Sequence, residues 1–154
     1  MTRTGLMVGL AIVALPFGAL AQEQHTMVQP NAVKWAAAPP ALPKGAQIAV
    51  LSGDPGKDGP FAFRLKFPAG FKVPAHTHPA DENVTVISGT LNMGTGDKLD
   101  PKKTEAIKTG GFIHMPKGMP HFGWVSQETI VQLNGNGPFT VTYVNPADDP
   151  RKTN

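Results

Sequence analysis

Turn-forming residues interrupt this chain about every 8–12 residues, and this spacing argues against long helices over most of its length. The 154 residues include 17 glycines and 16 prolines. Between the turns lie short runs rich in β-branched and aromatic residues, which favour strands. Their number and spacing predict a single all-β domain, a sandwich or barrel, rather than alternating strands and helices. The ten predicted strands are Gln47–Leu51, Phe61–Phe67, Phe71–Ala75, Asn83–Ser88, Thr90–Met93, Glu105–Lys108, Phe112–Met115, Phe122–Val125, Thr129–Leu133 and Phe139–Val144.

One of these runs shows how such a strand would pack. Within Phe61–Phe67, large apolar residues alternate with Ala62, Arg64 and Lys66. Successive side chains of a strand point to opposite faces, so one face of this strand is expected to be buried and the other more polar. The glycine-containing segments Gly94–Gly96 and Asn134–Gly137 are predicted to be turns between strands.

Composition excludes several classes of function. The chain has no cysteine, which rules out disulfides, cysteine-based zinc sites, thiol nucleophiles and iron–sulfur clusters. Its 14 basic and 11 acidic residues give a net charge of +3 and are scattered without a basic run. Neither nucleic acid nor an anionic membrane is therefore expected as a partner. Any metal must be held by histidine and carboxylate side chains.

The first 21 residues have the pattern of a secretory signal peptide. Arg3 supplies the positive start, Gly5–Leu15 is apolar, and Ala19–Ala21 is a small-residue cleavage site. The apolar run is shorter than the ~20 residues that span a bilayer, and an uncleaved anchor is the alternative. We expect a mature chain that begins at Gln22, is periplasmic or secreted, and has no membrane attachment after cleavage.

Residues 22–45 are predicted to form an extended, proline-rich N-terminal arm. Four prolines between residues 30 and 43 oppose a helix or a central strand, and Trp35 is the one large apolar anchor. Such a segment cannot make a core of its own. We expect it to cover a partner in a homodimer or its own barrel, with an unstructured linker as the alternative. The barrel domain is predicted over residues 46–146, followed by a polar tail over residues 147–154.

Three histidines and a glutamate give the strongest chemical signal in the sequence. His76 and His78 lie two residues apart where neighbouring prolines oppose a helix, so on a strand they share one face. A bend after them can return Glu82 to the same point, and His121 begins another predicted strand. Imidazole and carboxylate ligands suit iron, manganese, zinc, nickel or copper, and four of them leave two octahedral positions for water or substrate. The set predicts a divalent transition-metal site.

The spacing around these residues resembles the two sequence motifs of the cupin superfamily. The residues that carry the resemblance are Gly70, His76, His78, Glu82 and Gly89 for the first motif, and Gly110, Pro116–Gly118 and His121 for the second. The final asparagine of the second motif would fall at Val125, a departure that bears on barrel packing or pocket polarity more than on the metal. The resemblance implies a double-sheet jelly-roll β-barrel that holds a divalent metal through His76, His78, Glu82 and His121.

The reaction is less constrained than the site. Cupins include dioxygenases, isomerases and lyases as well as non-catalytic binding and sensing proteins. Catalysis needs a proton-transfer group near the open metal positions, and the candidates are His114, Gln132 and Tyr143. His114 shares a strand face with Phe112, and a hydrogen-bonded wall histidine is the alternative. Gln132 lies in an otherwise apolar strand with Ile130, and a structural amide is the alternative. We expect a metalloenzyme acting on a small molecule, of the oxygenase, isomerase or lyase type. The alternative is a metal-dependent protein that binds or senses a small ligand without turnover.

Overall fold

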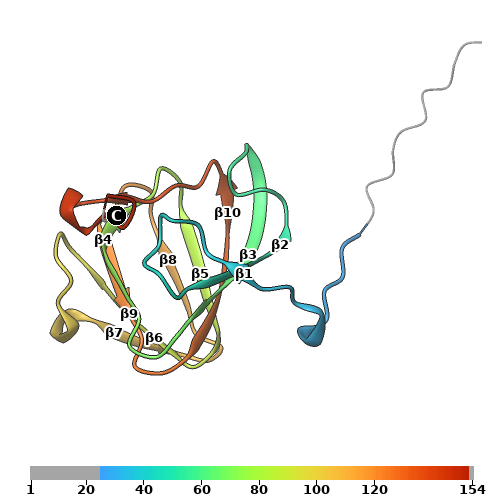
Figure 1. The fold of residues 1–154 in the computed structure, drawn as a ribbon, viewed down its shortest axis with the longest axis horizontal. Helices are drawn as coiled ribbons and strands as arrows, with labels where there is room; N and C mark the ends of the chain where they lie inside the picture. Colours follow the sequence, from blue (N-terminus) through green and yellow to red (C-terminus); the bar gives the residue numbers. More distant parts are fainter. Residues whose placement is uncertain (1–24, 153–154) are drawn as a thin grey trace, which may run out of the picture.

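The structure, a computed structural model, describes residues 25–152, whose strands form two antiparallel sheets facing each other (Figure 1). The six-stranded sheet contains, in spatial order, β1 (Ala36–Ala37), β2 (Gln47–Ser52), β3 (Gly59–Phe67), β10 (Thr129–Gly137), β5 (Glu82–Ser88) and β8 (Phe112–Met115). The five-stranded sheet contains β11 (Thr142–Tyr143), β4 (Lys72–Thr77), β9 (His121–Trp124), β6 (Thr90–Thr95) and β7 (Glu105–Lys108). Short 3₁₀ helices occur at η1 (Pro30–Ala32), η2 (Pro101–Lys103) and η3 (Pro146–Asp148).

This arrangement confirms the all-β, double-sheet jelly roll predicted from the sequence. The last predicted strand, Phe139–Val144, is mostly a loop that ends in the short β11. The predicted signal peptide, residues 1–21, lies outside the described residues. Within residues 25–152, no helix has both the length and the apolar character needed to cross a membrane.

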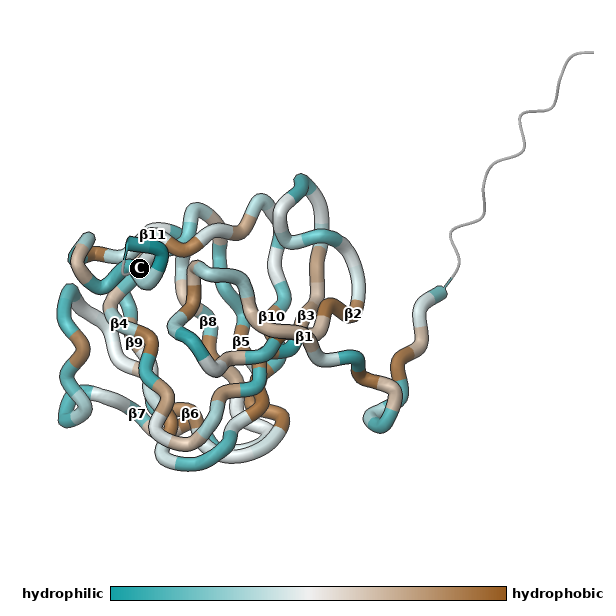
Figure 2. The backbone as a smooth tube through the Cα atoms, viewed as in Figure 1, coloured by the Kyte–Doolittle hydropathy of each residue, from teal (hydrophilic) through white to brown (hydrophobic). Residues whose placement is uncertain are grey.

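The core lies between the two sheets and follows from alternation along the strands. On β3, Phe61, Phe63 and Leu65 are buried, whereas Arg64 between them is half-buried on the outer face. Because β3 pairs with both β2 and β10, the inward residues of three strands form one layer. Short hydrophobic and hydrophilic stretches accordingly alternate along the backbone in Figure 2. Val125, which stands where the cupin motif has asparagine, belongs to this buried cluster and contributes to packing.

Two glycine-containing segments predicted as turns contribute to strands instead. Asn134–Gly137 extends β10 and continues its pairing with β3. A Cβ added at Gly135 would lie 3.0 Å from the Phe61 ring, and one added at Gly94 in β6 would lie 2.7 Å from the ring of Phe122. Both glycines therefore allow an aromatic ring to approach the backbone closely, a role that local sequence does not distinguish from a turn.

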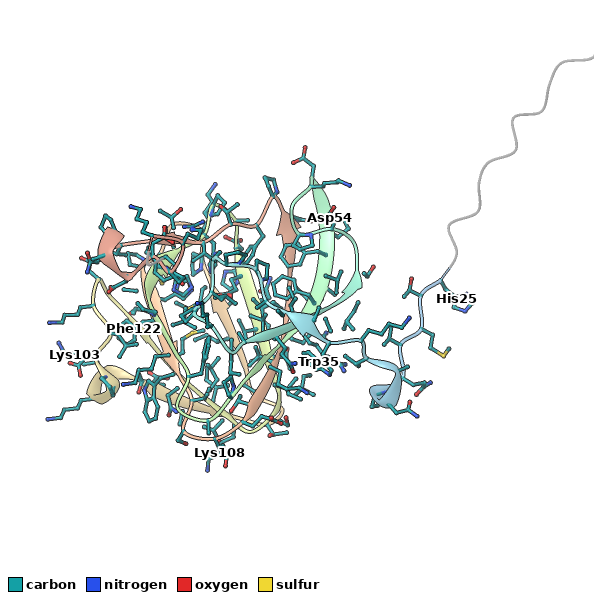
Figure 3. The ribbon with its side chains drawn as sticks, viewed as in Figure 1. His25, Trp35, Asp54, Lys103, Lys108 and Phe122 are labelled. Carbon is teal, nitrogen blue, oxygen red and sulfur yellow. The ribbon has the colours of Figure 1, made fainter. Side chains whose placement is uncertain are left out.

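The part of the proline-rich arm from Trp35 to Leu42 covers its own barrel, which is one of the arrangements expected from the sequence. Strand β1 pairs with β2 at the edge of the six-stranded sheet. Beside it, the Lys66 ammonium lies 4.5 Å from the centroid of the Trp35 ring, labelled in Figure 3. Leu42 packs against the core, and the Tyr143 hydroxyl donates a 2.7 Å hydrogen bond to the Ala41 carbonyl. The homodimer stays a prediction, which light scattering on the mature chain would test.

Replacing Trp35 with alanine is expected to lower the free energy of unfolding by about 1–2 kcal/mol. The side chain is half-buried, so it contributes part of the burial energy of a large aromatic residue together with the cation–π contact to Lys66. Urea unfolding of the mature chain measures the change. Lys34→Ala, at an exposed position of the same arm, is the control and should change stability by less than about 0.5 kcal/mol. Equal effects of the two substitutions would contradict the anchoring role.

Candidate metal centre

Three neighbouring chain segments bring the four predicted ligands together. His76 lies on β4, and its pairing partner on β9 is His121. His78 directly follows β4, and Glu82 begins β5 after a bend in which the Lys117 amide donates to the Asp81 carboxylate. All four ligand side chains are buried, with residue exposures of 2–6%. Strand pairing and this bend therefore place three imidazoles and one carboxylate at one point inside the barrel.

The donor atoms of the cluster are close enough to share one ion. One ring nitrogen from each of His76, His78 and His121 lies within 4.8 Å of the others. The Glu82 carboxylate adds Oε2 at 3.1 Å from His121 Nε2 and Oε1 at 3.8 Å from His78 Nε2. Oxygen and nitrogen donors at such separations can bind a cation placed between them.

Backbone carbonyls fix which nitrogen of each imidazole is free. The Nδ1 atoms of His76, His78 and His121 lie 2.7, 2.7 and 2.9 Å from the carbonyl oxygens of three backbone residues. Those acceptors are Pro74, Thr140 and Met119 respectively. A carbonyl only accepts hydrogen bonds, so each Nδ1 carries a proton and donates it. Each Nε2 is thereby left to face the cluster, which is the arrangement that metal-binding histidines have in proteins.

Several of the buried donor atoms face one another without a hydrogen bond. His78 Nε2, His121 Nε2 and Glu82 Oε2 are fully buried and have no hydrogen-bond partner among the described residues. Because Nδ1 carries the proton of neutral His121, its Nε2 can only accept a hydrogen bond. This atom faces Glu82 Oε2, which is also an acceptor, at 3.1 Å. Burying such a pair is unfavourable unless a proton or a metal cation lies between them. The residues therefore fit a divalent cation.

The surroundings lower the pKa values of His76, His78 and Glu82 and raise the pKa of His121. Burial and the charges of His121 and His78 lower the pKa of His76 to about 3, and burial also lowers the pKa of His78. Burial alone would raise the pKa of Glu82, but the contact with His121 and the nearby His78 hold it below its usual value. Burial would likewise lower the pKa of His121, yet Glu82 raises it. Of the three imidazoles, His121 is thus the one on which the site favours a proton, and a bound cation would replace that proton.

The cluster faces a cavity of about 250 Å³ between the sheets. Most of the wall is apolar and comes from the inward faces of the strands, including Ile48, Phe63, Leu65, Val84, Val131 and Leu133. The arm contributes Pro39, Ala41 and Leu42 to the same wall. A metal bound by the cluster would therefore lie beside an apolar space that can hold a small molecule.

His114, a predicted proton-transfer candidate, does not face the cavity. The inward positions of β8 are Ile113 and Met115, so His114 is exposed on the outer face. Its Nδ1 makes a 3.0 Å hydrogen bond with the side-chain oxygen of Asn83 on the neighbouring strand. Its position excludes direct contact with a ligand in the cavity. His25 also lies away from the cluster, at the end of the arm that projects from the barrel (Figure 3).

Gln132 and Tyr143 are likewise not placed for proton transfer. Gln132 points outward from β10, because Val131 and Leu133 occupy the inward positions, and it accepts a 3.1 Å hydrogen bond from Arg64 Nε. Tyr143 is buried beside His76, with ring centroids 6.0 Å apart, but its hydroxyl donates its hydrogen bond to the Ala41 carbonyl of the arm. Burial raises the pKa of Tyr143 to about 12, which keeps the phenol protonated at neutral pH.

Sequence analysis missed the loop between β10 and β11, which supports His78. Phe139 stacks on the His78 ring, with ring centroids 4.1 Å apart and an interplanar angle of 17°. The next residue, Thr140, supplies the carbonyl that accepts from His78 Nδ1. These contacts join residues about sixty positions apart, and no local spacing or motif signals them. The loop therefore orients a predicted ligand through tertiary contacts alone.

The fold and the buried ligand set define this protein as a cupin, and comparison with known proteins agrees. The chain belongs to the family described as "Domain of unknown function (DUF4437)", which matches residues 22–151. It is 33% identical over 107 residues to germin-like protein subfamily 2 member 1 of Arabidopsis thaliana. That alignment covers 65% of this chain and 48% of the relative, so the chain spans about half the length of this curated protein.

Solved structures share the same fold. A polyketide cyclase from Streptomyces resistomycificus superposes with a TM-score of 0.66 at 22% identity, covering 82% of this chain and 90% of the cyclase. An RmlC-like cupin from Shewanella frigidimarina gives a TM-score of 0.57 at 13% identity, covering 76% of this chain and 94% of that protein. Similarity at these identities establishes the cupin fold and leaves the activity to be argued from the site.

Proposed function

We propose that this chain is an exported, metal-dependent enzyme that acts on a small organic molecule through His76, His78, Glu82 and His121. The observation that carries the proposal is the set of buried donor atoms that face one another and have no hydrogen-bond partner among the described residues. These donors lie in the wall of an apolar cavity, so a bound ligand and a bound metal would be neighbours. Buried polar atoms left unpaired in this way are costly, and metal binding would satisfy them.

The chain's own residues have separable roles in this proposal. Three backbone carbonyls hold the imidazoles with Nε2 toward the site, which orients the ligands before any ion binds. Glu82 supplies the negative charge that offsets part of the cation's charge. The apolar wall excludes water from the site. The metal, when bound, would polarise ligand oxygens or take part in oxidation.

A non-catalytic binding protein is the second candidate, and one observation favours it. Among the residues that the structure describes along the cavity, the only imidazole and carboxylate side chains are the four ligands themselves. His114 and Gln132 face outward, and the hydroxyl of Tyr143 is bonded to the arm. Without a separate acid or base, turnover would depend on the metal and its four ligands.

Turnover by untagged, metal-loaded protein separates the two candidates. Protein reloaded with iron, manganese, nickel or zinc would be assayed for oxygen uptake and product formation against phenols, diketones and sugar acids. We expect product formation with at least one metal. In Glu82→Ala the activity should fall by more than the ~10–100-fold that is typical of changes to groups outside the ligand set. His114→Ala is the control and should retain activity. Tight ligand binding without product for every metal would favour the binding protein.

Export is the part of the proposal that concerns the N-terminus. The family match begins at residue 22, where the predicted mature chain also begins. Expressed with its own N-terminus, the chain is expected in the periplasm or medium, shortened by residues 1–21. Intact-mass measurement of the exported and membrane fractions tests this expectation. A full-length product in the membrane fraction would instead support an uncleaved anchor.

A further inference from the structure

The cavity beside the metal ligands has few polar groups that could recognise a substrate. Apart from the four ligands, the described residues that line it include only two with polar side chains, Thr140 and Arg151. The remaining wall is aliphatic or aromatic, with Phe63, Leu65 and Leu133 as examples. Thr140 is exposed, in the loop between β10 and β11, and Arg151 is exposed near the C-terminus. Polar recognition is thus concentrated at the metal ligands.

The guanidinium of Arg151 is already engaged. Its Nε and Nη2 lie 2.7 and 2.8 Å from the two carboxylate oxygens of Asp149, which is a bidentate ion pair. Nη2 also donates to the Val141 carbonyl at 3.2 Å. A substrate carboxylate would have to compete with Asp149 for this cation. Arg151 therefore braces the C-terminal segment beside the cavity and does not provide a free anion-binding group.

The scarcity of free polar groups in the cavity wall favours some substrate classes over others. A hydrophobic pocket discriminates against one added hydroxyl by about 100-fold, because the hydroxyl loses water and gains no partner. A sugar acid has several hydroxyls, and a small dianion such as oxalate has a second charged end. The apolar wall would leave these groups unpaired. The size of the space, about 250 Å³, lies below the usual range of ~300–1,000 Å³ for ligand pockets and favours a small molecule.

We propose that the cavity binds a small, mainly apolar molecule with a single oxygen-bearing polar end, of the diketone or phenol class. The polar end lies at the metal ligands, and the apolar body packs against Phe63, Leu65 and Leu133. Phe139, stacked on His78, joins the metal ligands to this apolar wall. The inference rests on the proposed function and narrows it to one substrate class.

Calorimetric binding of benzoylacetone, glucuronate and oxalate to the untagged mature protein tests this preference. Metal content is measured first, and titrations are made with both metal-loaded and chelator-treated protein. We expect benzoylacetone to bind at least about 100-fold more tightly than glucuronate to the loaded protein, and still to be preferred when metal is absent. Equal or tighter binding of glucuronate or oxalate would overturn the substrate class. If glucuronate or oxalate binds as tightly while the metal content is normal, only the substrate class is wrong and the metal site is retained. Absence of metal binding would overturn the proposed function itself.

Filling the cavity provides a second test. Ala41→Phe places a large side chain where the arm lines the cavity and should weaken benzoylacetone binding at least tenfold at unchanged metal content. Ala36→Phe, at an exposed position of the same arm outside the cavity lining, is the matched control and should bind like the parent. If Ala41→Phe fails to fold, Val141→Phe in the loop between β10 and β11 replaces it. Unchanged binding in a folded, cavity-filled variant would show that the ligand lies elsewhere.

Discussion

Replacing His121 with alanine is expected to remove most of the bound metal and to destabilise the metal-free protein. The substitution deletes one of four ligands, so metal affinity should fall by more than the ~10–100-fold seen when a supporting group is changed. It also removes the closest partner of the buried Glu82 carboxylate, because His121 Nε2 lies 3.1 Å from Glu82 Oε2 in the parent protein. Breaking a buried ion pair by removing one member costs on the order of 3–5 kcal/mol.

Elemental analysis and urea unfolding in the presence of a chelator measure these two effects. His114→Ala is a matched control, because it removes an exposed histidine whose contact is a hydrogen bond to Asn83 on the outer face. The control should keep the parent's metal content and lose less than about 1.5 kcal/mol. Equal metal in His121→Ala and the parent would remove His121 from the ligand set.

Acid is expected to destabilise the metal-free protein through His76. In the unfolded chain this imidazole takes up a proton near pH 6.5, whereas in the folded protein its pKa is lowered to about 3 by burial and by the charges of His121 and His78. The unfolded state therefore binds the proton first as the pH falls. The stabilisation is fully present above pH 6.5 and is lost on the way to about pH 3, by on the order of 4–5 kcal/mol. The pKa of His78 is lowered too and acts in the same direction.

Urea unfolding with chelator at pH 7.5, 6.0 and 4.5 tests this dependence. Other groups also titrate over this range, so the informative quantity is the difference between the parent and His76→Gln, whose side chain does not titrate. The parent should lose more stability than the variant as the pH falls. Parallel curves for the two proteins would show that His76 is not held neutral by the fold.

Strand geometry explains why the ligands could be predicted from the sequence. His76 and His78 share a face because side chains alternate along a strand, and antiparallel pairing then sets His121 opposite His76. The same alternation predicted that Phe61, Phe63 and Leu65 would be buried. Local pattern is informative here because large apolar residues mark the inner face of the strand.

The same reasoning failed for His114 because the apolar residue on its face is not buried. Phe112 shares that face and is 60% exposed, so hydrophobicity indicated the wrong side of β8 as the inner one. Gln132 was misplaced similarly, since its neighbour on the outer face is the half-buried Ile130. Which face of a strand points inward depends on the partner sheet, and that information is absent from the segment itself.

The supports of the site could not be predicted for a different reason. Phe139 and Thr140 contact His78 from a loop, and Tyr143 holds the arm at Ala41. Each contact joins residues that are distant in the sequence, and none belongs to a periodic pattern. Closure of the barrel creates these contacts, so they become visible only in the folded structure.

X-ray absorption spectroscopy of chelator-treated, untagged protein reloaded with cobalt tests the metal centre most directly. The spectrum reports how many imidazoles coordinate the ion, and elemental analysis of the same sample gives the stoichiometry. The account predicts about one cobalt per chain with three imidazoles in its shell, unchanged in His114→Ala. Failure of the parent to retain cobalt, or a shell without imidazole, would contradict a metal site formed by His76, His78, Glu82 and His121.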